Sequence, residues 1–201
     1  MKGREVLIAV TGGIAAYKTA ALVSQLTQAG AGVSVIMTRS ATRLVTPKTF
    51  EALSGRPVGT AVFGPGAHPH IEPARQAEVL CIAPATANII AKAALGLADC
   101  LVSTVILAFD GPIIVAPAMN CQMWCKPPTM RNIAQLRADG MVIIDPEAGH
   151  LSCGEIGPGR MAEPEKIFRV IEEQLAAVDR KERAKTIAEK SPLSHRERGR
   201  G

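Results

Sequence analysis

Short apolar runs alternate with longer segments of helical period along most of this 201-residue chain. The apolar runs are rich in Val, Ile, Leu and Ala, which is typical of strands that are buried on both faces. Strands are predicted at 5–10, 33–37, 79–83, 113–116 and 141–144. Helices are predicted at 14–28, 46–53, 86–95, 101–109, 129–138 and 163–178. This alternation predicts an α/β fold in which helices cover both faces of a mostly parallel sheet.

The net charge of +5 is concentrated at the C-terminus. Residues 180–201 contain eight Lys or Arg and three Glu, so residues 1–179 carry equal numbers of acidic and basic side chains. A neutral body with one Trp, one Tyr and four Phe lacks the field and the stacking platforms of a nucleic-acid binder. We therefore expect one domain over 1–179 and a basic, disordered tail over 180–201 that does not make the protein a nucleic-acid binder.

No apolar stretch is long enough to cross a bilayer, and the N-terminus leads into a strand without a signal-peptide pattern. These features favour a cytoplasmic protein without membrane contact. Five cysteines are an odd number, which argues against a disulfide framework. Cys121 and Cys125 have no second Cys or His pair nearby, so no metal site is predicted. Each cysteine is expected to be a small buried residue, except Cys153, which lies in the glycine-rich segment 146–161 that is predicted to be a loop.

Glycines follow the first predicted strand, where a parallel sheet commonly binds its ligand. Gly12 and Gly13 precede a helix and resemble a phosphate loop, because glycine allows the backbone to approach an anion at a helix N-terminus. A Walker loop does not match, since Tyr17 stands where that motif has glycine. NAD is disfavoured because no acidic residue follows the second strand. A mononucleotide site and an ordinary tight turn both remain open.

Polar residues also follow the later strands. Thr86 can cap a helix or bind an anion, and Asn120 can bind a carboxylate or shape a turn. His70 stands before a helix and could move a proton near neutral pH, although a loop histidine is often inert. Arg160 could bind an anion or favour the thiolate of Cys153.

Taken in order, these segments resemble one family, the flavin-containing cysteine decarboxylases. The resemblance is closest to the branch that acts on phosphopantothenoylcysteine in coenzyme A biosynthesis, and it spans residues 5 to 178. The motifs are TGGIAAYK (11–18), HIE (70–72), PATAN (84–88), PAMNxxMW (117–124) and CGxxGxGRM (153–161).

The resemblance implies a flavodoxin-like (Rossmann-type) three-layer sandwich that binds FMN and assembles as a homotrimer or as an assembly of trimers. It makes His70 the catalytic base, Asn120 the group that binds the substrate carboxylate, and Cys153 the final proton donor. Met119 and Arg160 would also contact the small-molecule substrate. The implied flavin ligands are Gly12, Gly13, Ile14, Thr38, Arg39, Ser40, Thr86, Ala87, Asn88, Ile89, Ser103 and Ala118.

The implied reaction converts 4′-phosphopantothenoylcysteine to 4′-phosphopantetheine through thioaldehyde and enethiolate intermediates, with FMN supplying the redox chemistry. Alternatives are a peptidyl-cysteine decarboxylase, a flavin prenyltransferase and a flavin-binding regulatory subunit without enzymatic activity. The joint presence of His70, Asn120 and Cys153 favours the coenzyme A reaction. Members of this branch are commonly fused to the synthetase that makes their substrate, so a phosphopantothenoylcysteine synthetase is an expected partner. Cys121 and Cys125 and the segment from Ser191 have no counterpart in the resemblance.

Overall fold

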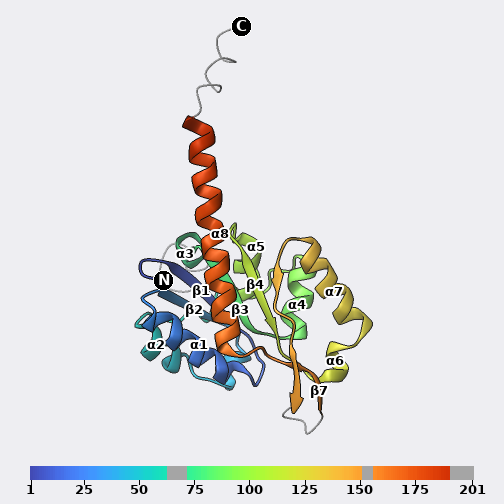
Figure 1. The fold of residues 1–201 in the computed structure, drawn as a ribbon. Coiled ribbons are helices and arrows are strands. Elements are labelled where there is room, and N and C mark those ends of the chain that lie inside the picture. Colours follow the sequence, from blue (N-terminus) through green and yellow to red (C-terminus); the bar gives the residue numbers. More distant parts are fainter. Residues whose placement is uncertain (63–71, 151–155, 191–201) are drawn as a thin grey trace.

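A parallel sheet lies at the centre of the molecule (Figure 1). The structure is a computed structural model that describes residues 1–62, 72–150 and 156–190. Within these ranges the sheet has five strands in the order β2-β1-β3-β4-β5, which is the flavodoxin-like order. The predicted α/β fold is therefore confirmed. The strands are β1 (Glu5–Val10), β2 (Gly32–Met37), β3 (Val79–Ala85), β4 (Ile113–Pro117) and β5 (Val142–Ile143).

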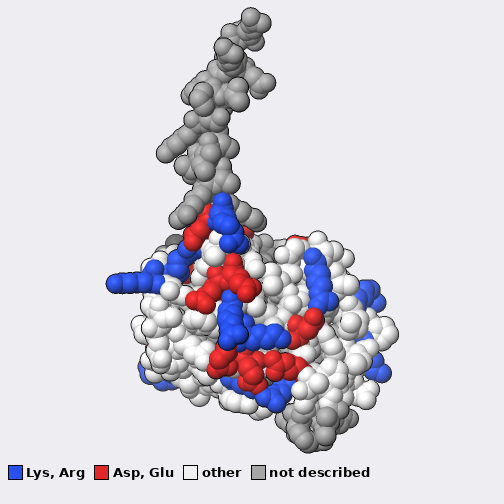
Figure 2. All heavy atoms as spheres, in the orientation of Figure 1, with Lys and Arg blue, Asp and Glu red and all other residues white. Residues whose placement is uncertain are grey.

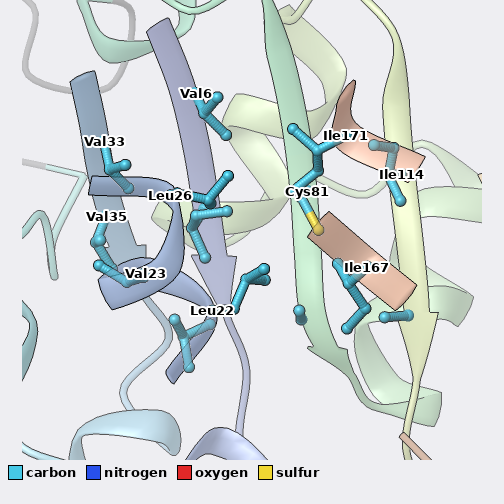
Figure 3. Packing of buried hydrophobic residues seen from close by; sticks show 14 of the residues in the cluster. Val6, Leu22, Val23, Leu26, Val33, Val35, Cys81, Ile114, Ile167 and Ile171 are labelled. Carbon is cyan, nitrogen blue, oxygen red and sulfur yellow. The ribbon is translucent and has the colours of Figure 1, made fainter. Parts of the chain in front are cut away.

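Helices cover both faces of the sheet. Successive residues of β1 alternate between the two cores: Val6 and Ile8 pack on one face, and Leu7 and Ala9 pack on the other. Helices α1, α2 and α8 close the first core, where Figure 3 shows side chains of α1 and α8 against the strands. Helices α4, α5 and α7 close the second core. Their bounds are α1 (Ala16–Gln28), α2 (Pro47–Ser54), α4 (Ala87–Leu95), α5 (Leu101–Ala108), α7 (Pro127–Ala138) and α8 (Pro164–Lys190).

Helix α8 is longer than the sequence pattern predicts. Its first part buries Ile167, Ile171 and Leu175 against the sheet, which accounts for the predicted helix. The helix then continues to Lys190, past residue 180 where a disordered tail is predicted, and projects from the body (Figure 1). No apolar period marks this extension, since the sequence 179–190 is dominated by charged residues that the pattern assigns to solvent.

Charged side chains cluster along α8 and the surface beside it, whereas the remainder of the visible face is mostly uncharged (Figure 2). Arg4, which precedes β1, contacts two other segments, the residue before β3 and helix α8. Its guanidinium donates to Glu78 Oε1 at 3.0 Å, to Asp179 Oδ1 at 2.6 Å and to the Leu175 carbonyl oxygen at 3.1 Å. These bonds join β1, the residue before β3, and α8.

The predicted loop at 146–161 contains an antiparallel hairpin. Its strands are β6 (Glu147–His150) and β7 (Ile156–Arg160), with Gly149 paired to Gly157. Four glycines and two prolines in this stretch hide the strand signal, because both residue types are depleted in strands. Short elements that the pattern also missed are η1 (Ala41–Arg43) and α6 (Cys121–Trp124), whereas α3 (Glu72–Gln76) is the helix expected after His70.

Two cysteines illustrate opposite outcomes for the expected burial. Cys81 is completely buried in β3, and burial raises the pKa of its thiol to about 12, so it is an inert core residue. Cys125 is exposed at the end of α6, so the prediction that it is buried is wrong. Cys100 and Cys121 are half-buried. Helix α6 is a single turn that ends where Cys125 begins a connection to α7, and no core lies beneath that residue.

Among the described residues, no helix combines the length and apolarity that a membrane crossing requires.

Candidate functional site

A cavity of about 690 Å³ opens at the carboxyl ends of β1, β3 and β4. It lies where the strand order reverses, because β2 and β3 follow β1 on opposite sides. The volume is within the range of small-molecule sites. The lining residues are Gly12, Gly13, Ile14, Ala15, Tyr17, Lys18, Thr86, Ala87, Ala118, Met119, Asn120, Met123, Gly159, Arg160 and Met161.

Thr11 fixes two of the loops that form this cavity. Its side chain is buried, and its hydroxyl donates to the Pro84 carbonyl oxygen at 2.6 Å and accepts from the Thr86 N–H at 3.1 Å. Thr19, one turn into α1, is also buried and donates to the Ala83 carbonyl oxygen at 2.8 Å. These two hydroxyls provide hydrogen-bond partners for backbone groups at the end of β3 and in the residue that follows it. They hold the Gly12-Gly13 turn against the loop that follows β3.

Gly12 is needed for the close approach of the loop after β2. A Cβ at residue 12 would lie 2.4 Å from Ser40 Cβ, so any larger residue would displace that loop. Ser40 and Arg39 also line a second hollow of about 730 Å³, together with Thr42 and Arg43. The structure thus brings Ser40 beside the glycine turn, whereas Arg39 faces a neighbouring hollow.

The loop after β4 supplies Ala118, Met119 and Asn120 to the cavity wall. Ala118 N–H donates to the Ala85 carbonyl oxygen at 3.0 Å, which keeps this loop beside the one after β3. Asn120 caps α6, since its Oδ1 accepts from the Gln122 N–H at 2.8 Å. The same amide carries two N–H donors, the type of group that binds a carboxylate.

Strand β7 is held directly on this loop. Met119 N–H donates to the Gly159 carbonyl oxygen at 2.9 Å. Gly159 has a φ of +140°, and a Cβ there would lie 2.2 Å from the Met119 carbonyl oxygen. Only glycine combines this backbone conformation with this approach. The hairpin therefore forms one side of the cavity and places Arg160 and Met161 in its wall.

Residues of the PATAN motif have different surroundings. Thr86 and Ala87 line the cavity, and Thr86 Oγ1 accepts from the Ile89 N–H at 3.5 Å as the cap of α4. Ile89 is buried in the second core, and Asn88 is exposed outside the cavity. The structure brings the first two residues to the predicted site and leaves the other two away from its wall.

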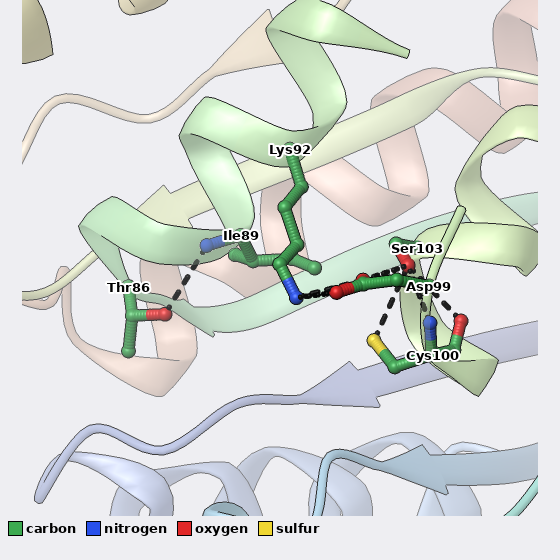
Figure 4. Close-up of polar contacts among 6 residues, drawn as sticks. All are labelled: Thr86, Ile89, Lys92, Asp99, Cys100 and Ser103. Atoms are coloured by element: carbon green, nitrogen blue, oxygen red, sulfur yellow. Dashed lines mark hydrogen bonds and ion pairs between the residues drawn. The ribbon is translucent and has the colours of Figure 1, made fainter. Parts of the chain in front are cut away.

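Ser103 and Thr38 also form hydrogen bonds with residues that are close to them in sequence. Ser103 is buried, and its hydroxyl bonds to the Cys100 backbone and to Asp99 at the start of α5, where Asp99 also pairs with Lys92 at 2.7 Å (Figure 4). Thr38 Oγ1 accepts from the Ala41 N–H at 3.3 Å. Neither side chain lines the cavity, and both hydroxyls form hydrogen bonds with residues that are close in sequence.

Two predicted catalytic residues, His70 and Cys153, lie outside the described residues. Cys153 belongs to the segment 151–155 that connects β6 to β7 in the sequence.

Several cavity residues were not singled out as site residues from the sequence. Tyr17 and Met123 are exposed on its rim, at 62% and 48% respectively, and Met161 is buried in its wall. Lys18 also lines the cavity, although the sequence pattern assigns it no role beyond its place in the TGGIAAYK motif. The available signal for Lys18 was its place one turn after the glycines, where a helix directs a side chain back over its N-terminus.

The charge on the cavity wall is positive. Lys18 and Arg160 are its charged lining residues among those described, and no Asp or Glu lines it. Behind them, Glu163 Oε1 accepts from Lys18 Nζ at 2.8 Å and forms an ion pair with Arg160. The hydrogen bond from Lys18 holds the pKa of the Glu163 carboxyl below its ordinary value, and the bond from Arg160 adds to this effect. Glu163 is therefore ionised at neutral pH.

The lining suits a phosphorylated aromatic ligand. Glycine backbone and the N-terminus of α1 can receive a phosphate, and Ile14, Ala118 and Met119 offer apolar surface to a ring system.

The family comparison agrees with this site. The family model described as Flavoprotein matches residues 1–176. The chain belongs to the Flavoprotein family. This match covers the sheet, the cavity and most of the buried part of α8, and it confirms the resemblance to the flavin-containing cysteine decarboxylases.

Curated relatives extend the comparison. The "Coenzyme A biosynthesis bifunctional protein CoaBC" of Bacillus subtilis (strain 168) is 48% identical over 179 residues, which cover 88% of this chain and 44% of the relative. The protein of the same name from Vibrio vulnificus (strain YJ016) is 44% identical over 176 residues, 86% of this chain and 44% of the relative. The chain thus spans less than half the length of these curated relatives.

Solved structures share the fold. A mutant PPC decarboxylase complexed with pantothenoylaminoethenethiol superposes with a TM-score of 0.76 at 33% identity, covering 86% of this chain and 97% of that chain. The FMN-dependent cysteine decarboxylase SpaF superposes with a TM-score of 0.77 at 32% identity, covering 88% and 98%. This family therefore includes proteins that bind FMN.

Proposed function

We propose that this chain catalyses the FMN-dependent decarboxylation of 4′-phosphopantothenoylcysteine to 4′-phosphopantetheine. The observation that carries the proposal is the placement of Asn120 in the same cavity as the Gly12-Gly13 turn. A carboxylate-binding amide and a phosphate-binding turn are what this substrate and this cofactor require in one site. The sequence identity to the CoaBC proteins supports the choice of the coenzyme A reaction over a peptide reaction.

FMN would lie between the loops that follow β1, β3 and β4. Gly12, Gly13 and Ile14 would contact it from one side, and the backbone of Thr86 and Ala87 and the methyl group of Ala118 from the other. Ser40, which abuts Gly12, would complete the phosphate end, with Arg39 and Thr38 behind it. Ser103, Asn88 and Ile89 would act by supporting α4 and α5, since they do not reach the cavity wall.

Bound FMN would supply the reversible two-electron oxidation that makes loss of carbon dioxide from a cysteine carboxamide feasible. Asn120 would donate its amide hydrogens to the substrate carboxylate and thereby fix the carbon that loses carbon dioxide. His70 would accept the substrate proton, and Cys153 would donate the last proton. Met119, Met123 and Tyr17 would exclude water from this end of the cavity.

The assembly would be a homotrimer or a larger assembly of trimers in the cytoplasm. A phosphopantothenoylcysteine synthetase, in the same chain or in a separate one, would supply the substrate.

A competition assay tests the proposal. Purified protein is mixed with phosphopantothenoylcysteine and a peptide ending in Cys, and the products are identified by mass spectrometry. We expect the first compound to lose carbon dioxide without net oxidation and the peptide to remain intact. Reaction of the peptide alone would show that the substrate is wrong. A yellow protein that converts neither would favour a flavin-binding regulatory subunit.

Cys153→Ser tests the predicted proton donor in the same assay. The variant should still release carbon dioxide and accumulate the oxidised enethiol product. Normal yields of 4′-phosphopantetheine from this variant would remove Cys153 from the reaction.

A further inference from the structure

The start of α8 connects the two cationic residues of the cavity wall. Glu163, immediately before the helix, contacts Lys18 of α1 and Arg160 of β7 through the same carboxylate oxygen, Oε1. Lys18 Nζ also lies 3.5 Å from the Met161 carbonyl oxygen. Helix α1 thus meets the distant segment 160–163, between β7 and α8, at one carboxylate on the edge of the cavity.

Only part of the donor capacity of the two cations is used by these contacts. A lysine ammonium has three N–H donors, and a guanidinium has five. Glu163 and the Met161 carbonyl engage two donors of Lys18, and Glu163 engages Nη2 of Arg160. Two positive charges against one negative charge leave a net positive charge at this edge. Both cations line the cavity, whereas Glu163 does not.

The side chains of Lys18 and Arg160 differ in how far they are buried. The Lys18 side chain is 10% exposed, whereas those of Glu163 and Arg160 are 38% and 43% exposed. A lysine buried to this extent needs a fixed counter-charge, which Glu163 provides. Lys18 also lies in the first turn of α1, where the free N–H groups of the helix add to the positive potential. A guanidinium, an ammonium and a helix N-terminus around one space are suited to a phosphate monoester.

We propose that Glu163 is a positioning residue that holds Lys18 and Arg160 together as a phosphate-recognition pair at the edge of the cavity. This inference rests on the proposed function, because phosphopantothenoylcysteine and FMN both carry a phosphate monoester. Glu163 acts through the two cations and does not itself contact the ligand.

The positioning role and simple electrostatics predict opposite results for Glu163→Gln. Removing the carboxylate makes the cavity edge more positive, so electrostatic attraction alone would lower KM for an anionic substrate. Loss of positioning instead raises KM, because Lys18 and Arg160 no longer share a fixed geometry. We expect KM for phosphopantothenoylcysteine to rise about tenfold and kcat to stay within about twofold, which corresponds to loss of ligand-binding contacts.

Glu165→Gln is the matched control. Glu165 lies in the first turn of the same helix, and its Oε1 accepts from Gln25 Nε2 of α1 at 2.9 Å, without contacting Lys18 or Arg160. Glu165→Gln removes the same charge as Glu163→Gln, and each of the two glutamates bonds to a side chain of α1. Glu165→Gln should therefore leave KM unchanged, and Glu163→Asp should restore part of the affinity because it retains the carboxylate. A fall in melting temperature in Glu163→Gln with both KM and bound FMN unchanged would show a purely structural role and overturn the proposal.

Chemical labelling tests the geometry without turnover. Acetic anhydride should modify Lys18 slowly in the wild type and faster in Glu163→Gln, with Lys48, whose side chain is 88% exposed, as the internal reference. Equal Lys18 labelling in both proteins would overturn the proposed contact. Absence of turnover in the wild type would refute the proposed function, whereas the labelling comparison would still test this contact.

The flavin content of the purified variants distinguishes the two phosphate sources. Loss of bound FMN from Glu163→Gln, with KM unchanged at saturating FMN, would assign the pair to the cofactor phosphate. Full FMN content with raised KM would assign it to the substrate phosphate. Unchanged FMN content together with unchanged KM would overturn the proposal.

Discussion

At the scale of single residues, Asn120 performs two tasks with one side chain. Its oxygen caps α6, and its amide hydrogens belong to the proposed carboxylate site. Asp is as good a helix cap as Asn, so Asn120→Asp should preserve the fold and the bound flavin. The added negative charge would repel the substrate carboxylate, and we expect carbon dioxide release to fall below detection.

The measurement is carbon dioxide release together with the flavin absorbance spectrum. Asn132→Asp, which makes the same change on α7 away from the cavity, should retain activity. Robust turnover by Asn120→Asp would exclude the assigned role.

The Thr11 hydroxyl gives a second prediction at this scale. Thr11→Val keeps the shape of the side chain but leaves the Pro84 carbonyl and the Thr86 N–H without their partner. We expect the free energy of unfolding to fall by about 1–3 kcal/mol, as measured by urea denaturation. Thr27→Val is the control, because Thr27 bonds only to the Val23 carbonyl within its own helix. A similar loss in both variants would mean that Thr11 has no special structural role.

Some of these residue roles could be predicted from the sequence, and others could not. Gly12, Ala118 and Asn120 directly follow strands, and parallel strands bring such residues to one edge whatever their detailed packing. Ser103 also looked available for a phosphate, but its hydroxyl is taken up by Asp99 and the Cys100 backbone. Sequence position identifies which loops meet, whereas hydrogen-bond competition between neighbours decides which side chains reach the cavity.

At the scale of secondary-structure elements, the seating of β7 depends on Gly159. Ala at this position would place a methyl group 2.2 Å from the Met119 carbonyl oxygen in a backbone conformation that alanine rarely adopts. Gly159→Ala should therefore displace the hairpin and lower both stability and flavin affinity. Gly96→Ala is the control, since Gly96 has a φ of +67° and a Cβ there would meet nothing within 4 Å. It should cost only about 1 kcal/mol. Equal losses by thermal denaturation would show that the approach to Met119 is unimportant.

A pH-dependent contact joins the start of β1 to the segment after α2. Arg56 donates to both carboxylate oxygens of Glu5, at 2.6 and 3.0 Å, and this bonding holds the pKa of Glu5 below its ordinary value of 4.5. A lowered pKa in the folded state stabilises the fold above pH 4.5, and the contribution disappears as pH falls through the folded-state pKa.

Glu5→Gln should therefore be less stable than the wild type at pH 7, and the difference should shrink as the pH falls below 4.5 and through the folded-state pKa of Glu5. Urea denaturation at several pH values measures it. A difference that does not shrink as the pH is lowered would show that the ion pair is not its cause.

The helices and strands with a clear apolar period were predictable, and the exceptions have physical causes. Strand β1 alternates between two cores, so all five residues after Glu5 are apolar and the strand is easily recognised. The β6–β7 hairpin has glycines at the positions where it contacts the α6 segment, because a side chain there would collide with that segment. The sequence therefore lacks the β-branched and aromatic residues that would indicate a strand. The sequence of the last part of α8, 179–190, is dominated by charged residues and lacks an apolar period, so the pattern does not predict a helix there.

At the scale of the whole molecule, large apolar side chains remain on the surface. Leu95, Leu97 and Leu107 are between 51% and 69% exposed in this single chain. Burial between subunits would remove this apolar area from water, which is consistent with the proposed trimer. We expect light scattering to give three times the chain mass of 21.1 kDa, or a multiple of that trimer. A monomer at micromolar concentration would contradict the proposed assembly.

Helix α8 runs from the cavity to the opposite edge of the sheet. Glu163, just before it, bonds to Lys18 beside the cavity, and Asp179 bonds to Arg4 before the first strand. Its last turns consequently leave the body on the side remote from the ligand (Figure 1). A domain or an affinity tag joined directly after this helix would extend away from the cavity, beyond the opposite edge of the sheet. Such a fusion would leave the entrance to the cavity clear, so the C-terminus is the suitable attachment point for immobilising the protein with its binding site accessible.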